Sequence, residues 1–218
     1  QAKYLMTAHH GDDLMETILM RIARGTTLEG YSGFKKQINM GDYIIYRPFI
    51  EKTKEELLEY DEKNHIPYAI DSSNNSNVYT RNRYRKEVLP FLKKEDPNIH
   101  EKFLKFSITI QKANSYIERE TTKALKKVIF HDRVLINKFL EQDDLIQQTI
   151  LEDILENYYQ DDLILINDHH INLLLNLIKS KKANSEVTLP NDVIATKNYN
   201  EFYLHRILEE ISHYEIEL

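Results

Sequence analysis

Residues 7–25 decide the fold of this chain, and they read Thr7-Ala8-His9-His10-Gly11-Asp12-Asp13-Leu14-Met15-Glu16-Thr17-Ile18-Leu19-Met20-Arg21-Ile22-Ala23-Arg24-Gly25. The apolar stretch before them, Tyr4-Leu5-Met6, is typical of the end of a buried strand. Asp12 or Asp13 is expected to open a helix, because a carboxylate satisfies free amide groups and the helix dipole. The helix is expected to run to Gly25, so the stretch predicts a strand, a turn and a helix.

The predicted helix has two faces of different chemistry. Its apolar residues follow helical spacing and predict a buried face: Met15, Ile18, Leu19 and Ile22. Charged and hydroxyl residues gather on the other face: Asp13, Glu16, Thr17, Arg21 and Arg24. A polar face at the carboxyl end of a strand is where open α/β sheets bind ligands. The structural alternative is that the charges are ordinary dipole partners and the histidines are satisfied turn residues.

A second polar cluster follows a loop-like run, Asp71-Ser72-Ser73-Asn74-Asn75. It reads Tyr79-Thr80-Arg81-Asn82-Arg83-Tyr84-Arg85-Lys86-Glu87-Val88-Leu89-Pro90. The whole chain carries a net charge of −6, yet residues 79–106 hold eight basic and four acidic residues, and residues 141–178 hold nine acidic residues without Lys or Arg. Such a basic stripe can bind a phosphate backbone in a salt-dependent way. A solvated helix face is the alternative.

These motifs together resemble the tRNA(Ile)-lysidine synthetases, a family within the N-type ATP pyrophosphatases. The resemblance rests on His-His-x-x-Asp-x-x-Glu-Thr at 9–17 with its trailing Arg-x-x-Arg-Gly, on Arg47-Pro48-Phe49, on Asp-x-Ser-Asn at 71–74, and on Tyr-Thr-Arg-Asn-Arg-x-Arg at 79–85. The motifs occur in the family's order over residues 7–90. Ser72, where the family commonly has Pro, and Ser76 or Asn77, where it often has Asp, depart from the pattern.

The resemblance implies an α/β fold class with two domains. Residues 1–96 would be the C-terminal half of a PP-loop catalytic domain with a partial parallel, Rossmann-like sheet. Residues 97–218 would be a mainly helical domain with a small β tail. The chain has five glycines and no Gly-Gly pair, so it lacks the family's Ser-Gly-Gly-x-Asp-Ser loop, whose amides cradle phosphate. We therefore expect a fragment that is inactive alone, without the family's separate C-terminal tRNA-binding domain.

The implied activity is ATP-dependent ligation. The wobble cytidine of a tRNA(Ile) with a CAU anticodon is adenylated, and the ε-amine of L-lysine then displaces AMP to form lysidine. ATP is a substrate, and Mg²⁺ is expected to accompany it. The resemblance implies three groups of residues and no resident metal site. Catalytic residues are Asp13, Glu16 and His10; lysine- or adenylate-binding residues are His9, Thr17, Arg21 and Arg24; tRNA-binding residues are Arg81, Asn82, Arg83 and Arg85.

The composition of the chain excludes cysteine chemistry and indicates the compartment of the protein. The chain has no cysteine, which excludes disulfides, thiolate zinc sites and cysteine nucleophiles. It contains no apolar run of about 18 residues and no export leader. We expect a cytoplasmic protein without a membrane partner; a homodimer is one oligomeric state left open.

The rest of the chain predicts strands and helices in alternation, then helices, then strands. Expected strands are 42–46, 68–70, 187–189, 193–195 and 202–204; expected helices are 54–63 behind a capping box at Thr53, a long helix from the break at 96–98 towards Val128, and helices near 143–159 and 168–179. His169-His170 fits a helix N-terminal turn better than a metal site.

Two other functions compete with ligation. A metal-dependent phosphohydrolase would use His9, His10, Asp12 and Asp13 as ligands, but it would leave the arginines of residues 81–85 without a role. A non-catalytic tRNA-binding module would need the basic segment alone. A different ligating member of the pyrophosphatase group is a third alternative.

Overall fold

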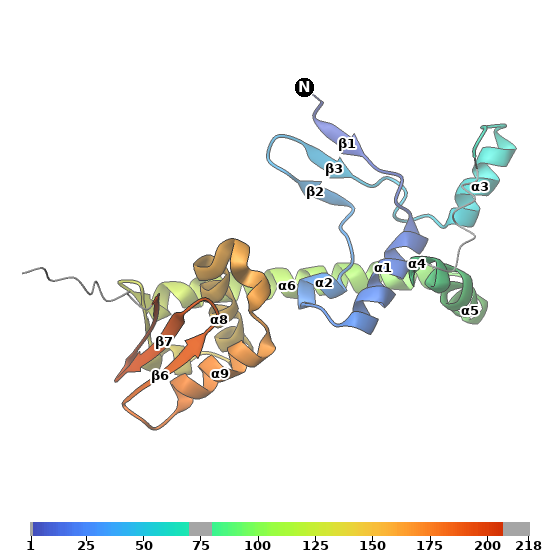
Figure 1. Cartoon of the computed structure of the whole chain (residues 1–218). Helices are drawn as coiled ribbons and strands as arrows, with labels where there is room; N and C mark the ends of the chain where they lie inside the picture. The colour runs from blue at the N-terminus through green and yellow to red at the C-terminus, as the bar shows by residue number, and fades with distance from the viewer. Residues whose placement is uncertain (1, 70–79, 207–218) are drawn as a thin grey trace, which may run out of the picture. The chain divides into compact units, whose positions relative to one another are not determined.

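The computed structural model describes residues 2–69 and 80–206. Its contacts divide into two compact units, Gln1–Ser115 and Tyr116–Leu218 (Figure 1). The motif at 71–75 and Tyr79 lie outside the described residues. The division after Ser115 falls within the long helix α6, Ile99–Val128. The domain division at residue 96 stays a prediction.

The first unit contains a mixed three-stranded sheet of order β1-β3-β2. Strand β1 is Tyr4–Met6, β2 is Gln37–Asn39 and β3 is Ile44–Tyr46. Strand β1 is parallel to β3, as the α/β interpretation predicts, whereas β2 is antiparallel to β3. A tight hairpin explains why β2 is antiparallel to β3. Gly41 has a φ of 85° in the turn between the two strands, and such a short connection can join only antiparallel neighbours.

Two predictions about strands are wrong. Strand β1 is not buried, because Tyr4, Leu5 and Met6 are 58, 50 and 67 % exposed; it hydrogen-bonds to β3 from the edge of the sheet. In the expected strand 68–70, Tyr68 and Ala69 are irregular, and residue 70 lies outside the described part. Pro67 precedes them and cannot donate a ladder hydrogen bond.

Helix α1 is Gly11–Arg24 and begins earlier than predicted. His10, not Asp12 or Asp13, is the residue before it, and its backbone N–H donates to Asp13 Oδ2 at 3.1 Å. Gly11 approaches the backbone closely, since its N–H donates to Lys52 O at 2.7 Å and an added Cβ would lie 3.0 Å from that oxygen. A larger residue would push the first turn of α1 away from this loop.

The buried face of α1 also differs from the predicted one. Leu14, Met15 and Ile18 are completely buried, and Leu14 and Ile18 form a small core with Ile50 and partly buried side chains of α6. Ile22 is 52 % exposed, because the helix end extends beyond that small core. The polar face is confirmed in part only, since Glu16 is fully buried.

The first unit contains further helices along the chain. Helix α2 is Leu28–Tyr31, and α3 is Lys54–Lys63. The capping box of α3 is confirmed, with Glu56 N–H donating to Thr53 Oγ1 at 3.1 Å and Thr53 N–H donating to Glu56 Oε2 at 2.7 Å. The basic motif forms one continuous helical stretch: α4, Thr80–Arg83; a π-helical turn, Tyr84–Val88; and α5, Leu89–Glu95.

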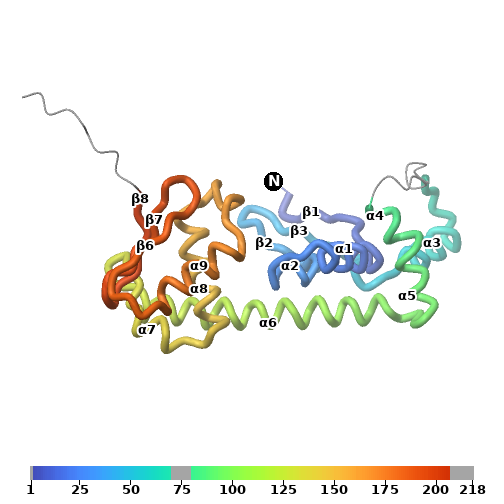
Figure 2. Tube along the Cα trace, turned by 60° about the horizontal axis from the view of Figure 1, so that its bottom comes forward, coloured from blue at the N-terminus to red at the C-terminus, as the bar shows by residue number. Residues whose placement is uncertain are grey.

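The second unit pairs helices with an antiparallel sheet of order β4-β5-β8-β7-β6. Its strands are β4 (Ile129–Phe130), β5 (Arg133–Leu135), β6 (Asn184–Leu189), β7 (Val193–Asn198) and β8 (Glu201–Arg206). Its helices after α6 are α7 (Ile136–Leu140), α8 (Asp144–Tyr159), a 3₁₀ helix (Gln160–Leu165) and α9 (Asp168–Lys179). Helices α8 and α9 lie beside β6, β7 and β8 (Figure 2).

The structure from α6 onward confirms the predicted long helix, the two later helices and the three C-terminal strands. The core between them holds Phe139, Leu151, Leu174 and Phe202, all completely buried. His169 and His170 lie in the first turn of α9, behind the capping residue Asn167. Among the described helices, none combines the length and apolar character needed to cross a membrane.

Candidate active site

The centre of the candidate site is a buried ion pair between α1 and the π-helical turn. Arg85 Nε donates to Glu16 Oε1 at 2.6 Å and Arg85 Nη2 donates to Glu16 Oε2 at 3.1 Å. The same Nη2 lies 3.3 Å from Asp13 Oδ1. One guanidinium therefore joins both predicted carboxylates, although it lies 69 and 72 residues away in sequence. A two-point contact of this kind fixes geometry as well as charge.

Burial makes the Glu16 carboxylate unusual. Its side chain is 0 % exposed, whereas Arg85 retains 27 % exposure. Burial raises the pKa of Glu16 above its ordinary value, and the neighbouring guanidinium groups of Arg85 and Arg81 only partly oppose that shift. The hydrogen bond to Glu16 in turn raises the pKa of Arg85. A buried carboxylate with a perturbed pKa in such a cluster indicates a functional site.

Three further predicted residues join this cluster. Arg81 Nε lies 3.3 Å from Glu16 Oε2, and Arg81 Nη2 donates to Thr17 Oγ1 at 3.1 Å. Thr17 in turn donates to the backbone carbonyl of Asp13 at 2.8 Å. On the other side, His10 Nε2 lies 3.4 Å from Asp13 Oδ2. The structure thus brings His10, Asp13, Glu16, Thr17, Arg81 and Arg85 together.

The other predicted residues lie apart from these contacts. Arg21 Nη1 donates to Gly30 O at 2.7 Å and Gly33 O at 2.8 Å, so it ties α1 to the loop around α2. His9 contacts Thr7 Oγ1 through Nδ1 at 2.9 Å, with its ring 5.2 Å from that of Phe34.

The remaining predicted arginines and Asn82 differ in exposure. Arg24 is exposed at the end of α1. Arg83 is also exposed and donates to Thr80 Oγ1 at 3.2 Å. Asn82, which directly precedes Arg83 in the sequence, is buried.

A second ion-pair group lies beside the start of α1. Asp12 Oδ2 accepts hydrogen bonds from the Lys54 backbone N–H at 3.1 Å and from Lys93 Nζ at 2.9 Å. Lys93 also donates to Glu55 Oε2 at 2.6 Å. Burial works against the charge of Lys93, but its hydrogen bonds to Glu55 and Asp12 outweigh burial and raise its pKa. These residues line a cavity of about 190 Å³ together with His10, Arg85, Leu89 and Pro90.

Lys93 and Glu55 belong to this group although no sequence pattern assigned them to a site. In sequence, Lys93 is one charge of the basic stripe, and Glu55 is a residue of a helix start. Their contact joins residues 38 positions apart, and Lys93 reaches Asp12 across 81 positions. No local pattern signals a pairing of that kind. The sequence predicts Asp12 as a helix-opening residue and as a ligand in the rival phosphohydrolase, and it does not predict the contact with Lys93.

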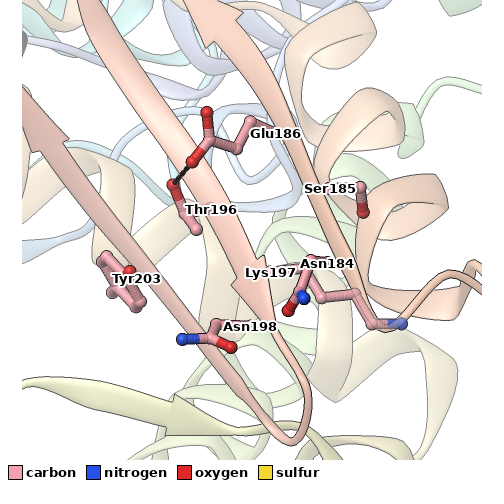
Figure 3. Close-up of a pocket in the computed structure, with 7 residues that line it drawn as sticks. All are labelled: Asn184, Ser185, Glu186, Thr196, Lys197, Asn198 and Tyr203. Carbon is pink, nitrogen blue, oxygen red and sulfur yellow. Dashed lines mark hydrogen bonds between the residues drawn. The ribbon is translucent and has the colours of Figure 1, made fainter.

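A larger polar cavity, of about 440 Å³, lies in the second unit along β6, β7 and β8. Figure 3 shows Glu186 and Thr196 directed toward each other, with Thr196 donating to Glu186 Oε1 at 3.0 Å. Lys197 extends away from them (Figure 3), and its Nζ donates to Ile178 O at 2.7 Å and Ser180 O at 2.6 Å. Lys197 therefore satisfies carbonyl groups at the end of α9.

Comparison with known proteins gives these contacts a family context. Residues 1–92 match the model of the PP-loop domain. The chain is 35 % identical over 206 residues to the tRNA(Ile)-lysidine synthase of Bacillus cereus and 36 % identical over 204 residues to that of Bacillus subtilis. The chain is therefore similar to tRNA(Ile)-lysidine synthases. The predicted resemblance is confirmed.

The similarity covers most of this chain and part of each relative. The two Bacillus proteins match 92 % and 91 % of the chain, which corresponds to 43 % of each relative. The bifunctional protein TilS/HprT of Listeria innocua is 38 % identical over 91 % of this chain and 31 % of its own length. The chain therefore spans less than half the length of each of these relatives.

Proposed function

We propose that this chain is part of an ATP-dependent tRNA(Ile)-lysidine synthase. In the first step the O2 oxygen of the wobble cytidine attacks the α-phosphate of ATP and pyrophosphate leaves. In the second step the ε-amine of free L-lysine forms a bond to C2, the C2–O bond breaks, and AMP leaves with the bonding electrons. The observation that carries this proposal is the buried Glu16 carboxylate, which Asp13, Arg81 and Arg85 surround.

The carboxylates suit the binding and deprotonation of the lysine nucleophile. The ε-ammonium of lysine must lose a proton before its nitrogen can attack. Asp13 and Glu16 offer negative charge to that ammonium, and the raised pKa of Glu16 favours a carboxyl that accepts a proton. His10, 3.4 Å from Asp13, orients that carboxylate. An incoming ammonium would occupy the position at Asp13 that Arg85 Nη2 holds in this structure.

The arginines suit the anionic substrates. Arg85 and Arg81 lie at the carboxylates, while Arg83 on the same helical stretch is exposed. We assign Arg81, Asn82, Arg83 and Arg85 to the tRNA and its target cytosine, since a guanidinium pairs with phosphates and base edges. We assign His9, Thr17, Arg21 and Arg24 to lysine or the adenylate, with Arg21 acting through the loop that it holds. A homodimer stays an open part of this proposal.

We propose no resident metal ion for this site. In the described ranges, 2–69 and 80–206, no three His, Cys, Asp or Glu side chains gather as a metal site. Mg²⁺ would enter with ATP, held by the phosphate oxygens, and no step of this proposal depends on a protein metal site. We rank the rival phosphohydrolase lower, because two of its four expected metal ligands already pair with cations. Asp12 pairs with Lys93, and Asp13 pairs with Arg85.

The test is lysidine formation by the full-length protein encoded by the gene, with tRNA(Ile), ATP and L-lysine. We expect Glu16→Gln to lower kcat at least tenfold, because the amide cannot accept the proton. The matched control is Glu29→Gln, an exposed carboxylate that pairs with Lys35, which should keep full activity. Absence of lysidine from the unaltered protein, with tRNA binding intact, would overturn the proposal and favour the non-catalytic tRNA-binding module.

A further inference from the structure

The helical stretch that carries the basic motif contains one π-helical turn, Tyr84–Val88, between α4 and α5. Leu89 N–H donates to Tyr84 O, five residues back, where an α-helix would bond four residues back. Pro90 gives a local reason for the wider turn, because its ring has no N–H and would clash with the carbonyl four residues before it. The turn therefore absorbs one extra residue within the stretch.

The extra residue decides which side chains share a face of this stretch. Arg81 and Lys93 are twelve positions apart, and in a regular α-helix with 3.6 residues per turn this corresponds to a rotation of about 120° from one to the other. One residue absorbed in the π-helical turn reduces the rotation to about 20°. Arg85 follows Arg81 by four residues and lies on the same face. The turn thus aligns three cations that an unbroken α-helix would spread apart.

All three cations contact carboxylates of α1. Arg81 Nε lies 3.3 Å from Glu16 Oε2, and Arg85 Nε donates to Glu16 Oε1 at 2.6 Å. Lys93 Nζ donates to Asp12 Oδ2 at 2.9 Å. The later residue of the basic stretch meets the earlier residue of α1, so the contacts form one ladder of ion pairs between two segments. A change at the Lys93 end of this ladder is therefore expected to move Arg85.

Lys93 anchors the end of the ladder. Its Nζ also donates to Glu55 Oε2 at 2.6 Å, in the first turn of α3. Asp12 Oδ2 accepts a second hydrogen bond, from Lys54 N–H at 3.1 Å. The Lys93 side chain is 21 % exposed and the Asp12 side chain 6 %, so water and salt screen this pair less than a surface pair. One ammonium therefore fixes α5 to the first turns of both α1 and α3.

Arg85 is the cation on which the Glu16 carboxylate depends most. The charged groups that face Glu16 among the described residues are Asp13 on α1, Arg81 on α4 and Arg85 in the π-helical turn. Burial raises the pKa of Glu16, and the hydrogen bond from Arg85 is the largest opposing effect. Arg85 is also the less exposed of the two arginines, at 27 % against 47 % for Arg81. The position of Arg85 therefore sets how readily Glu16 exchanges a proton.

We propose that Lys93 is a positioning residue for the proposed reaction. It holds α5 on α1, and through the π-helical turn it fixes the guanidinium of Arg85 on Asp13 and Glu16. This inference rests on the proposed function, in which Glu16 accepts the proton of the lysine nucleophile. It gives a role in the reaction to a residue that no sequence motif marked, and it explains why the basic stretch contains a π-helical turn.

The experiment measures lysidine formation by the full-length protein at saturating tRNA(Ile), ATP and L-lysine over a range of pH. Lys93→Met keeps an unbranched stem and removes the charge. We expect it to lower kcat about tenfold or more, since a small misplacement of a reacting group is costly. We also expect the acid limb of the kcat profile to move to higher pH, because a displaced Arg85 opposes the raised pKa of Glu16 less.

Two variants serve as controls. Lys93→Arg keeps a cation at this position and should recover most of kcat and the original pH profile. Lys52→Met removes an exposed lysine that pairs with Glu56 of α3 at 3.0 Å, and it should leave kcat and the profile unchanged. If Lys93→Met lowers kcat while its pH profile stays that of the unaltered protein, Lys93 acts on stability only and the inference is wrong. Lys93→Gln, which keeps a hydrogen-bond donor, takes its place if Lys93→Met does not fold.

The coupling between Lys93 and Arg85 is also measurable without activity. Melting temperatures are compared for Lys93→Met, Arg85→Met and the double variant. We expect the double variant to lose less than the sum of the two single losses, because residues of one network do not contribute independently. Additive losses would overturn the inference. Absence of lysidine from the unaltered protein, together with non-additive losses, would remove the proposed function and leave the coupling.

Discussion

Replacing Arg85 with Met tests whether Glu16 is held as a buried anion. The substitution keeps an unbranched stem but leaves the fully buried Glu16 carboxylate without its two-point partner. Removing one partner of a buried pair costs roughly 3–5 kcal/mol. We expect about 3 kcal/mol here, at the lower end, because Arg81 stays 3.3 Å from Glu16 and the Arg85 side chain is 27 % exposed.

The assay is urea unfolding of Arg85→Met and of the control Arg83→Met. Arg83 lies two residues away on the same helical stretch, is exposed, and donates to Thr80, so its loss should cost below about 1 kcal/mol. Adding Glu16→Gln to Arg85→Met should recover most of the lost stability, because the unpaired charge is gone. A loss below about 1 kcal/mol in Arg85→Met, or no recovery in the double variant, would refute the reasoning.

The stability loss of Arg85→Met should depend on pH with a defined sign. Burial already raises the folded-state pKa of Glu16, and loss of Arg85 removes the group that opposes this shift most. A carboxyl with a raised folded-state pKa binds more protons in the folded than in the unfolded protein. Its stability cost is therefore absent below the unfolded-state pKa, grows as pH rises from there to the folded-state pKa, and is complete above it. Arg85→Met should be closest to the unaltered protein in mild acid and furthest from it at neutral pH.

Two more predictions concern the exposed arginine and the buried lysine of the second unit. Arg83→Gln should weaken tRNA binding and reduce the slope of log K against log salt by about 1, measured by filter binding from low to moderate salt; an unchanged slope would remove Arg83 from the phosphate contacts. Lys197→Met should lower the free energy of unfolding by about 1–3 kcal/mol, because the carbonyls of Ile178 and Ser180 lose their donor. An unchanged urea midpoint would show that these carbonyls find another partner.

Local patterns predicted the elements that have local causes. The capping box at Thr53 formed because its partner, Glu56, lies three residues away. Helices α8 and α9 formed where the apolar spacing placed them, and Asn167 caps α9 in front of the two histidines. The same reasoning failed at β1, where an apolar run was expected to be buried although it lies on a sheet edge. Apolar composition identifies a strand, but burial depends on what packs against it.

The candidate site depended on contacts that no local pattern contains. The resemblance named Asp13, Glu16, Arg81 and Arg85, but it did not indicate that Arg85 already neutralises both carboxylates. Local patterns indicated Asp12 as a helix-opening residue, and only the fold shows one of its oxygens held by Lys93 from 81 positions away. Glu16 and Asp12 are thus both acceptors that cations from distant parts of the sequence already occupy.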